Sequence, residues 1–71
     1  MQTSHYRINV ARYDGMNWNG TERKYVHHFR VLITDRPDAE QVTKDLRARF
    51  LEPEFQITVT YWDVRGTSVE W

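Results

Sequence analysis

The sequence predicts one small domain of the α+β class, residues 1–71, with its elements in the order β-β-α-β. Apolar and polar residues alternate over residues 5–13 and 24–34, which is the period of a half-buried strand. Apolar residues recur at spacings of three and four over residues 35–51, which is the period of an amphipathic helix. Residues 55–65 alternate again, and the tail 67–71 is compatible with a short fourth strand.

A hairpin is expected to join the first two strands. Asn19-Gly20 is typical of a two-residue type I′ turn, in which both residues have positive φ. With this turn the inward residues of the two strands oppose each other, in the pairs Tyr6–Ile33, Ile8–Val31 and Val10–Phe29. Slipping the pairing by one residue would bring polar side chains to the inward face, which favours this register. Asp14-Gly15 is the place where a β-bulge would alter it.

The helix predicted over residues 35–51 has a signal at each end. Asp35 is a good N-cap with Pro37 in the first turn, and Pro53 follows the last turn. Glu40–Lys44 and Asp45–Arg49 have the spacing and orientation of ion pairs that contribute about 0.2–0.5 kcal/mol each. The apolar stripe that we expect to face the sheet consists of Ala39, Val42, Leu46 and Phe50.

These elements predict an antiparallel three-stranded sheet of order 2-1-3, with the helix packed on one face. The helix leaves the second strand and returns the chain parallel to it, so the third strand can pair with the first. One helix covers only one side of such a sheet, so the other side and the outer strands are expected to be open.

Composition and charge exclude several classes of protein. The formal net charge is zero and aromatic residues make up 14%, unlike a disordered tail or a strongly basic nucleic-acid-binding arm. No apolar run is long enough to span a membrane, no signal peptide is visible and cysteine is absent, so we expect a cytoplasmic protein. The charge is divided unevenly, with +3 on residues 1–34 and −3 on residues 35–71.

Metal, cofactor and catalytic sites are not expected. His27 and His28 are adjacent in a strand and point to opposite faces, with His27 expected inward at the core margin and His28 outward. Ser4 and Ser68 lie near the termini without the glycine context of a nucleophile, and no phosphate-binding loop is present. A small nuclease using His5 and His28 is the enzymatic alternative, but a domain of this size offers no evident pocket. We therefore predict a protein that is not an enzyme.

The uncovered face of the sheet and the tip of the hairpin are the predicted contact surfaces. Arginine, tyrosine and tryptophan are enriched at the energetic centres of protein interfaces. The alternative is that the arginine stems lie over aromatic rings and the threonine-rich strands are simply good strand formers. For Trp18, the alternative to a partner contact is that the indole folds back onto Thr21 or Tyr25. For Trp71 the sequence leaves three roles open, which are to fill the core, to cover a sheet edge or to bind a partner. The predicted contact residues are Arg7, Tyr13, Trp18, His28, Arg30, Leu32 and Trp62.

These residues predict a small protein-binding module that acts as an inhibitor or adaptor of another protein. A compact, cysteine-free β-β-α-β unit rich in surface aromatics is similar to the short accessory proteins of phages and mobile elements, and this similarity implies a host protein as the partner. Formation of a homodimer is another way to cover the exposed face. The alternative function is nucleic-acid or nucleotide binding, in which aromatic and arginine side chains stack on bases.

Overall fold

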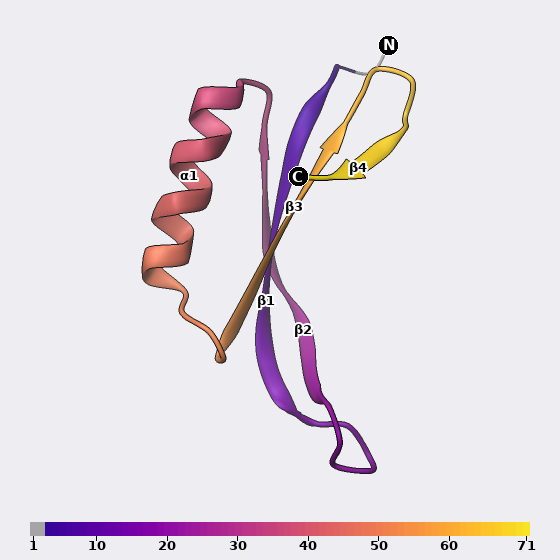
Figure 1. Cartoon of the computed structure of the whole chain (residues 1–71), viewed down its shortest axis with the longest axis vertical. Coiled ribbons are helices and arrows are strands. Elements are labelled where there is room, and N and C mark those ends of the chain that lie inside the picture. The colour runs from indigo at the N-terminus through magenta and orange to yellow at the C-terminus, as the bar shows by residue number, and fades with distance from the viewer. Residues whose placement is uncertain (1–2) are drawn as a thin grey trace.

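The computed structural model describes residues 3–71 and confirms the predicted α+β class (Figure 1). The elements are β1 His5–Met16, β2 Arg23–Ile33, α1 Arg36–Arg49, β3 Phe55–Trp62 and β4 Ser68–Glu70. The four strands form one antiparallel sheet in the order β2-β1-β3-β4, so the predicted order 2-1-3 is confirmed and the tail adds the fourth strand. Within the described residues, no helix has the length and apolar character needed to cross a membrane.

The core lies between β1 and α1. β1 has a strand on each side and the helix on one face, so its inward residues lose nearly all contact with water. Ile8 and Val10 are fully buried and Tyr6 is 8% exposed. Ala39 of α1 and Val59 of β3 are buried on the same side. The predicted inward face of the first strand is therefore confirmed.

α1 begins at the predicted N-cap. The Asp35 carboxylate accepts a hydrogen bond from the Asp38 N–H at 3.2 Å, which satisfies one of the free donors of the first turn. The buried helix residues are Ala39 and Thr43, so a threonine joins the face that was predicted to be wholly apolar. The other predicted stripe residues are half-buried, namely Val42, Leu46 and Phe50.

The side-chain bonds along α1 differ from the predicted ion pairs. Glu40 pairs with Arg36 at 3.2 Å, and Asp45 accepts a hydrogen bond from Gln41 at 2.9 Å. Each acid therefore bonds a residue four positions toward the N-terminus instead of four positions toward the C-terminus. The spacing on the helix surface is the same in both directions, so the sequence allows either choice.

A β-bulge in β2 changes the predicted register of the hairpin. Val10 opposes Phe29 as expected, but Ala11 opposes His27, so His28 is an extra residue on β2. The extra residue reverses the face of the β2 residues that precede it. The placement of His28 on the uncovered face and of His27 on the inward face is therefore wrong, because the two side chains exchange sides.

The second irregularity lies at Asp14-Gly15, the place where the sequence allowed a bulge. The register shifts between Tyr13 and Met16, and Gly15 has a φ of +91°. Beyond this point the hairpin extends past the end of α1, as Figure 1 shows at the bottom of the view. The far end of the hairpin is therefore not covered by the helix.

The hairpin tip, residues 17–22, has a turn that differs from the predicted one. Gly20 has a φ of +74°, and no non-glycine residue of the described chain has positive φ, so the type I′ turn is wrong. The Gly20 N–H donates to the Asn17 carbonyl at 2.9 Å. Trp18 and Asn19 are therefore the central residues of the turn, and Gly20 follows it in the left-handed conformation.

β3 ends at Trp62, three residues before the predicted end. Asp63 Oδ1 accepts hydrogen bonds from the N–H groups of Arg65 at 2.9 Å and Thr67 at 3.0 Å. These bonds turn the chain back directly after Trp62 and start β4. Val64 therefore lies in this turn and not in the strand predicted over residues 55–65.

Trp71 covers the core on the helix side. Its N–H donates to the Val59 carbonyl at 3.0 Å, and its ring centroid lies 4.8 Å from that of Tyr6. The Tyr6 ring also lies 4.9 Å from Tyr61, so three aromatic rings close this end of the core. Of the roles that the sequence left open for Trp71, packing against the core is the one that the structure supports.

Candidate functional site

We call the side of the sheet that faces away from α1 the open face. Successive strand residues point to opposite sides, so the open face carries the residues that alternate with the buried ones. The predicted contact residues that lie on it are Arg7, Tyr13, Arg30, Leu32 and Trp62. Its other members are His5, Asn9, Ala11, Tyr25, His27, Gln56, Thr58, Thr60, Ser68 and Glu70.

Arg7 and Trp62 form the centre of the open face. The Arg7 guanidinium carbon lies 4.2 Å from the centroid of the Trp62 ring, in cation–π contact. Arg7 Nε also donates a hydrogen bond to His5 Nε2 at 3.0 Å, and His5 Nδ1 lies 2.9 Å from the Thr3 carbonyl oxygen. Both bonds are satisfied when the His5 proton is on Nδ1. Arg7 and Trp62 are half-buried, so the pair is held in place before any partner arrives.

Arg30 and Leu32 extend this centre across β1 to β2. Arg30 opposes Asn9 and Leu32 opposes Arg7, so both lie on the same side as the Arg7–Trp62 pair. Leu32 is 61% exposed. Within residues 3–71, no carboxylate lies within 4.0 Å of the Arg7 or Arg30 guanidinium groups. This part of the open face therefore combines apolar surface with two cations that have no acidic partner.

Tyr13 and Tyr25 lie at the other end of the open face. Their ring centroids are 6.2 Å apart in an edge-to-face arrangement. The Tyr25 hydroxyl donates to the Pro53 carbonyl at 2.9 Å, and the Tyr13 N–H donates to the Glu54 carbonyl at 2.7 Å. The chain between α1 and β3 is thereby tied to the hairpin. An unbroken alternation in β2 would place Tyr25 inward with Phe29, and the β2 bulge is the reason that it lies on the open face.

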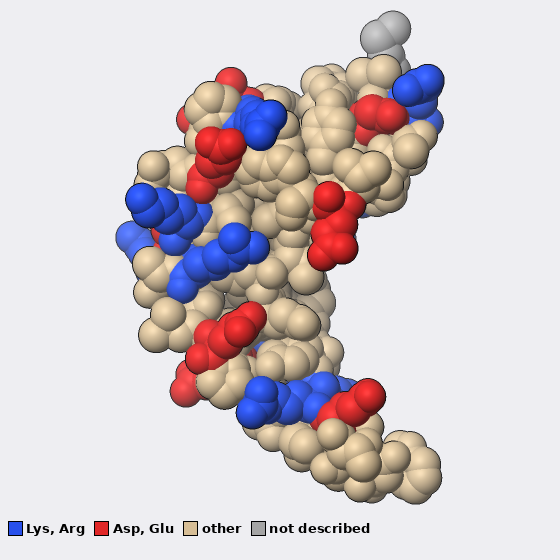
Figure 2. Space-filling model, viewed as in Figure 1, with Lys and Arg blue, Asp and Glu red and all other residues tan. Residues whose placement is uncertain are grey.

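The open face is concave along its length. Figure 1 shows the β3–β4 turn and the hairpin tip both curving away from α1, at opposite ends of the sheet. Figure 2 shows the outline of the molecule hollowed on this side, between those two ends. A twisted sheet with two bulges in its hairpin is expected to curve in this way.

Trp18 stands alone at the hairpin tip. It is 96% exposed, so the alternative that it folds back onto Thr21 or Tyr25 is wrong. The turn beneath it is held by side chains: Asn17 Oδ1 accepts from the Thr21 N–H at 3.0 Å, and Asn19 Oδ1 accepts from the Thr21 hydroxyl at 2.7 Å. An indole in this position exposes a large apolar area on a turn with a defined conformation.

His28 belongs to a different part of the molecule. It lies on the helix side, where its ring centroid is 5.3 Å from Phe29, 6.1 Å from Phe50 and 5.8 Å from Phe55. His27 lies on the open face, in the place predicted for His28, and no feature of the His-His pair in the sequence distinguishes the two. His5 and His28 lie on opposite sides of the sheet, so the structure does not bring together the pair considered for a nuclease.

Two further findings complete the description of the site. Over the described residues, no three histidine, aspartate or glutamate side chains lie close enough together to hold a metal ion. Comparison of the chain with protein-family models, with curated proteins and with solved structures finds no match.

Proposed function

We propose that this protein binds another protein through the open face, with the Arg7–Trp62 pair at the centre of the contact. The observation that supports the proposal is the fixed stack of Arg7 on Trp62, 4.2 Å apart, beside the exposed Leu32. Tryptophan and arginine are the residues that most often carry binding energy at interfaces. A pair that is already ordered loses little side-chain entropy when a partner covers it.

The charges of the open face indicate the chemistry of the partner. Arg7 and Arg30 have no carboxylate within 4.0 Å in the described chain, so a purely apolar partner would bury two cations without compensation. A partner that presents Asp or Glu beside apolar side chains would pair both guanidinium groups and cover Leu32 and Trp62. We therefore propose that the partner is a protein with a convex surface of acidic and apolar residues. The function of this protein is then to cover that surface or to recruit the partner.

Trp18 is proposed as a second, peripheral contact. It lies at the end of the hairpin, next to Met16, which is 46% exposed. Since the sheet curves, the tip would reach around a partner seated on the open face and insert the indole into an apolar pocket. Loss of Trp18 is expected to weaken the complex, while the partner still binds to the open face.

Nucleic-acid binding is the competing proposal, and two features make it less favourable. Arg7 occupies one side of the Trp62 ring, and Tyr13 and Tyr25 are in contact with each other, so these rings are not free to receive bases on both sides. The formal net charge of the chain is zero, which removes most of the electrostatic attraction to phosphates. Binding whose salt dependence is steeper than two ion pairs produce would favour nucleic acid over protein.

Photo-crosslinking tests the proposal. One variant carries a photo-crosslinking amino acid at position 32, and a control variant carries it at position 51. Leu32 on the open face is 61% exposed and Leu51 after α1 is 62% exposed, so the two positions differ in location but not in accessibility. A partner from the source cells should be captured from position 32 and not from position 51. Equal capture from both positions would contradict the proposal.

A pair of arginine variants then tests the chemistry of the contact. Arg30→Ala on the open face is expected to weaken the captured complex by more than about 1 kcal/mol, while Arg49→Ala at the end of α1 leaves it unchanged. Both residues are exposed, so neither substitution should unfold the protein. An Arg30→Ala variant that binds as tightly as the wild type would remove the open face as the contact surface.

A further inference from the structure

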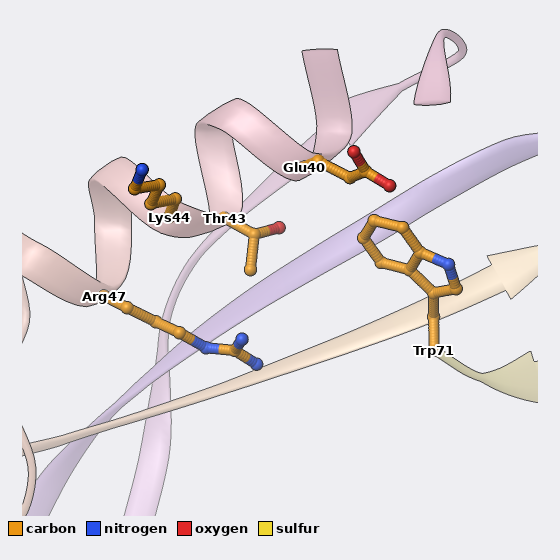
Figure 3. A pocket seen from close by; sticks show the side chains of 5 residues that line it. All are labelled: Glu40, Thr43, Lys44, Arg47 and Trp71. Atoms are coloured by element: carbon orange, nitrogen blue, oxygen red, sulfur yellow. The ribbon is translucent and has the colours of Figure 1, made fainter. Parts of the chain in front are cut away.

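A separate hollow lies on the helix side of the molecule, between α1 and Trp71. It encloses about 310 Å³ and is lined by Glu40, Thr43, Lys44, Arg47 and Trp71 (Figure 3). Four of these residues come from successive turns of α1, and the indole forms the opposite wall. A volume of this size is at the lower end of the range for small-molecule sites.

Thr43 is the feature of this hollow that points to a ligand. Its side chain is on the buried side of α1, at 5% exposure, and its hydroxyl has no hydrogen-bond partner among the residues that the structure describes. Figure 3 shows the hydroxyl oxygen directed toward Trp71. Buried hydroxyl groups are nearly always bonded, and valine has the same shape without the unpaired oxygen. An unpaired hydroxyl directed toward Trp71 therefore points to a polar group that enters the hollow.

The charges around Thr43 indicate an anion. Glu40, the acid of this group, is paired with Arg36 at 3.2 Å. Lys44 and Arg47 have no carboxylate within 4.0 Å in the described part of the chain. In Figure 3 the Arg47 guanidinium extends from α1 into the space below Thr43, whereas Lys44 points away from it. Figure 2 shows basic and acidic side chains interspersed over α1, so the attraction for an anion rests on Arg47 and not on a generally basic surface.

Trp71 supplies a flat apolar wall. Its ring packs on Tyr6 from one side, the Arg36 guanidinium carbon lies 6.0 Å from its centroid, and the residue remains 38% exposed. A planar ring could lie against the exposed part of the indole while an anionic group reaches Arg47, whose fork of N–H donors matches carboxylate and phosphate oxygens. The Thr43 oxygen exposes less than 1 Å² in the free protein, so its hydroxyl would donate to the same anionic group when ligand entry shifts the Trp71 indole.

We propose that this hollow binds a small organic anion with a flat ring, held by Arg47 and the Thr43 hydroxyl and stacked on Trp71. Carboxylate and phosphate share the chemistry that these residues recognise, and two probes distinguish them. Indole-3-acetate represents the carboxylates and phenyl phosphate the phosphates, with indole-3-acetamide as the uncharged control.

Titration of the ¹⁵N-labelled protein, followed by NMR, tests the proposal. One of the two anions should shift the indole N–H signal of Trp71 and leave those of Trp18 and Trp62 unchanged, and the neutral control should bind at least about tenfold more weakly. If the Trp71 signal does not move at about 10 mM of either anion, the proposal is wrong. A shift that the neutral control reproduces with equal affinity would also contradict it.

Two variants with matched controls test the assigned residues. Arg47→Gln should weaken binding about tenfold, whereas Arg49→Gln, from the same helix, should have no effect. Thr43→Val should weaken binding by about threefold or more without lowering the melting temperature of the free protein, whereas Thr58→Val on the open face leaves binding unchanged. A Thr43→Val variant that melts earlier and binds normally would show that the hydroxyl serves the fold alone.

Discussion

The contact between Arg7 and Trp62 makes a prediction that needs no partner. The two groups are 4.2 Å apart and half-buried. Cation–π pairs contribute about 0.5–1 kcal/mol when exposed and about 2 kcal/mol when desolvated, so a half-buried pair should contribute roughly 1 kcal/mol. The hydrogen bond from Arg7 to His5 adds to the effect of replacing Arg7, but it is not part of the coupling between Arg7 and Trp62.

A double-mutant cycle with Arg7→Gln and Trp62→Leu isolates this coupling. Urea unfolding of the wild type, the two single variants and the double variant should give a coupling free energy of about 1 kcal/mol. Arg12 supplies the control, because it opposes Phe55 at the other end of β3, roughly 23 Å from Trp62 at about 3.3 Å per residue. A cycle of Arg12→Gln with Trp62→Leu should be additive within about 0.5 kcal/mol.

A coupling energy near zero for Arg7 and Trp62, equal to that of the Arg12 control, would refute the reasoning. The stack would then be one of many equal side-chain arrangements, and the open face would have no ordered centre. The proposal of a preorganised binding surface would lose its main support.

Three further substitutions test the fold that carries the site. Ile8→Val should lower the free energy of unfolding by about 1 kcal/mol and the melting temperature by about 4–8 °C, because Ile8 is fully buried. The control Leu32→Ala should change the free energy of unfolding by less than about 0.5 kcal/mol, because Leu32 is 61% exposed. Equal losses in urea unfolding would contradict the assigned faces. Gly20→Ala should destabilise the protein by about 1–2 kcal/mol in thermal melts followed by circular dichroism, since its φ is +74° and no atom lies within 4 Å of the added carbon; an unchanged melt would mean that the turn has another conformation. Asp35→Ala should cost about 1 kcal/mol and speed hydrogen exchange in the first turn of α1; exchange at the wild-type rate would argue against the cap.

The candidate site was partly predictable from the sequence. Arg7 and Trp62 lie in segments that alternate without interruption, so their common face follows from the period of a strand. Their direct contact does not follow, because it depends on rotamers and on the space beside His5. The exposure of Trp18 also could not be predicted, since the sequence allows both the exposed and the folded-back indole.

His28 shows why part of the prediction failed. A strand period assigns a face only as long as each residue opposes one partner, and the bulge at His28 breaks that condition. The extra residue is accommodated where Phe50 at the end of α1 and Phe55 at the start of β3 offer an aromatic surface to its ring. These residues are more than twenty positions away in the chain, so the local pattern does not reveal them.

The sequence by itself determined the helix, the first three strands with their order 2-1-3, and the face of each residue within an unbroken strand. These properties depend on local periods, on the Asp35 cap and on the way that one helix must return the chain. Only the tertiary structure determined the bulge at His28, the packing of Trp71 against Tyr6 and the burial of Thr43. Each of these results depends on packing between segments far apart in the chain, where side-chain volume and available space select one arrangement among several that the local pattern allows.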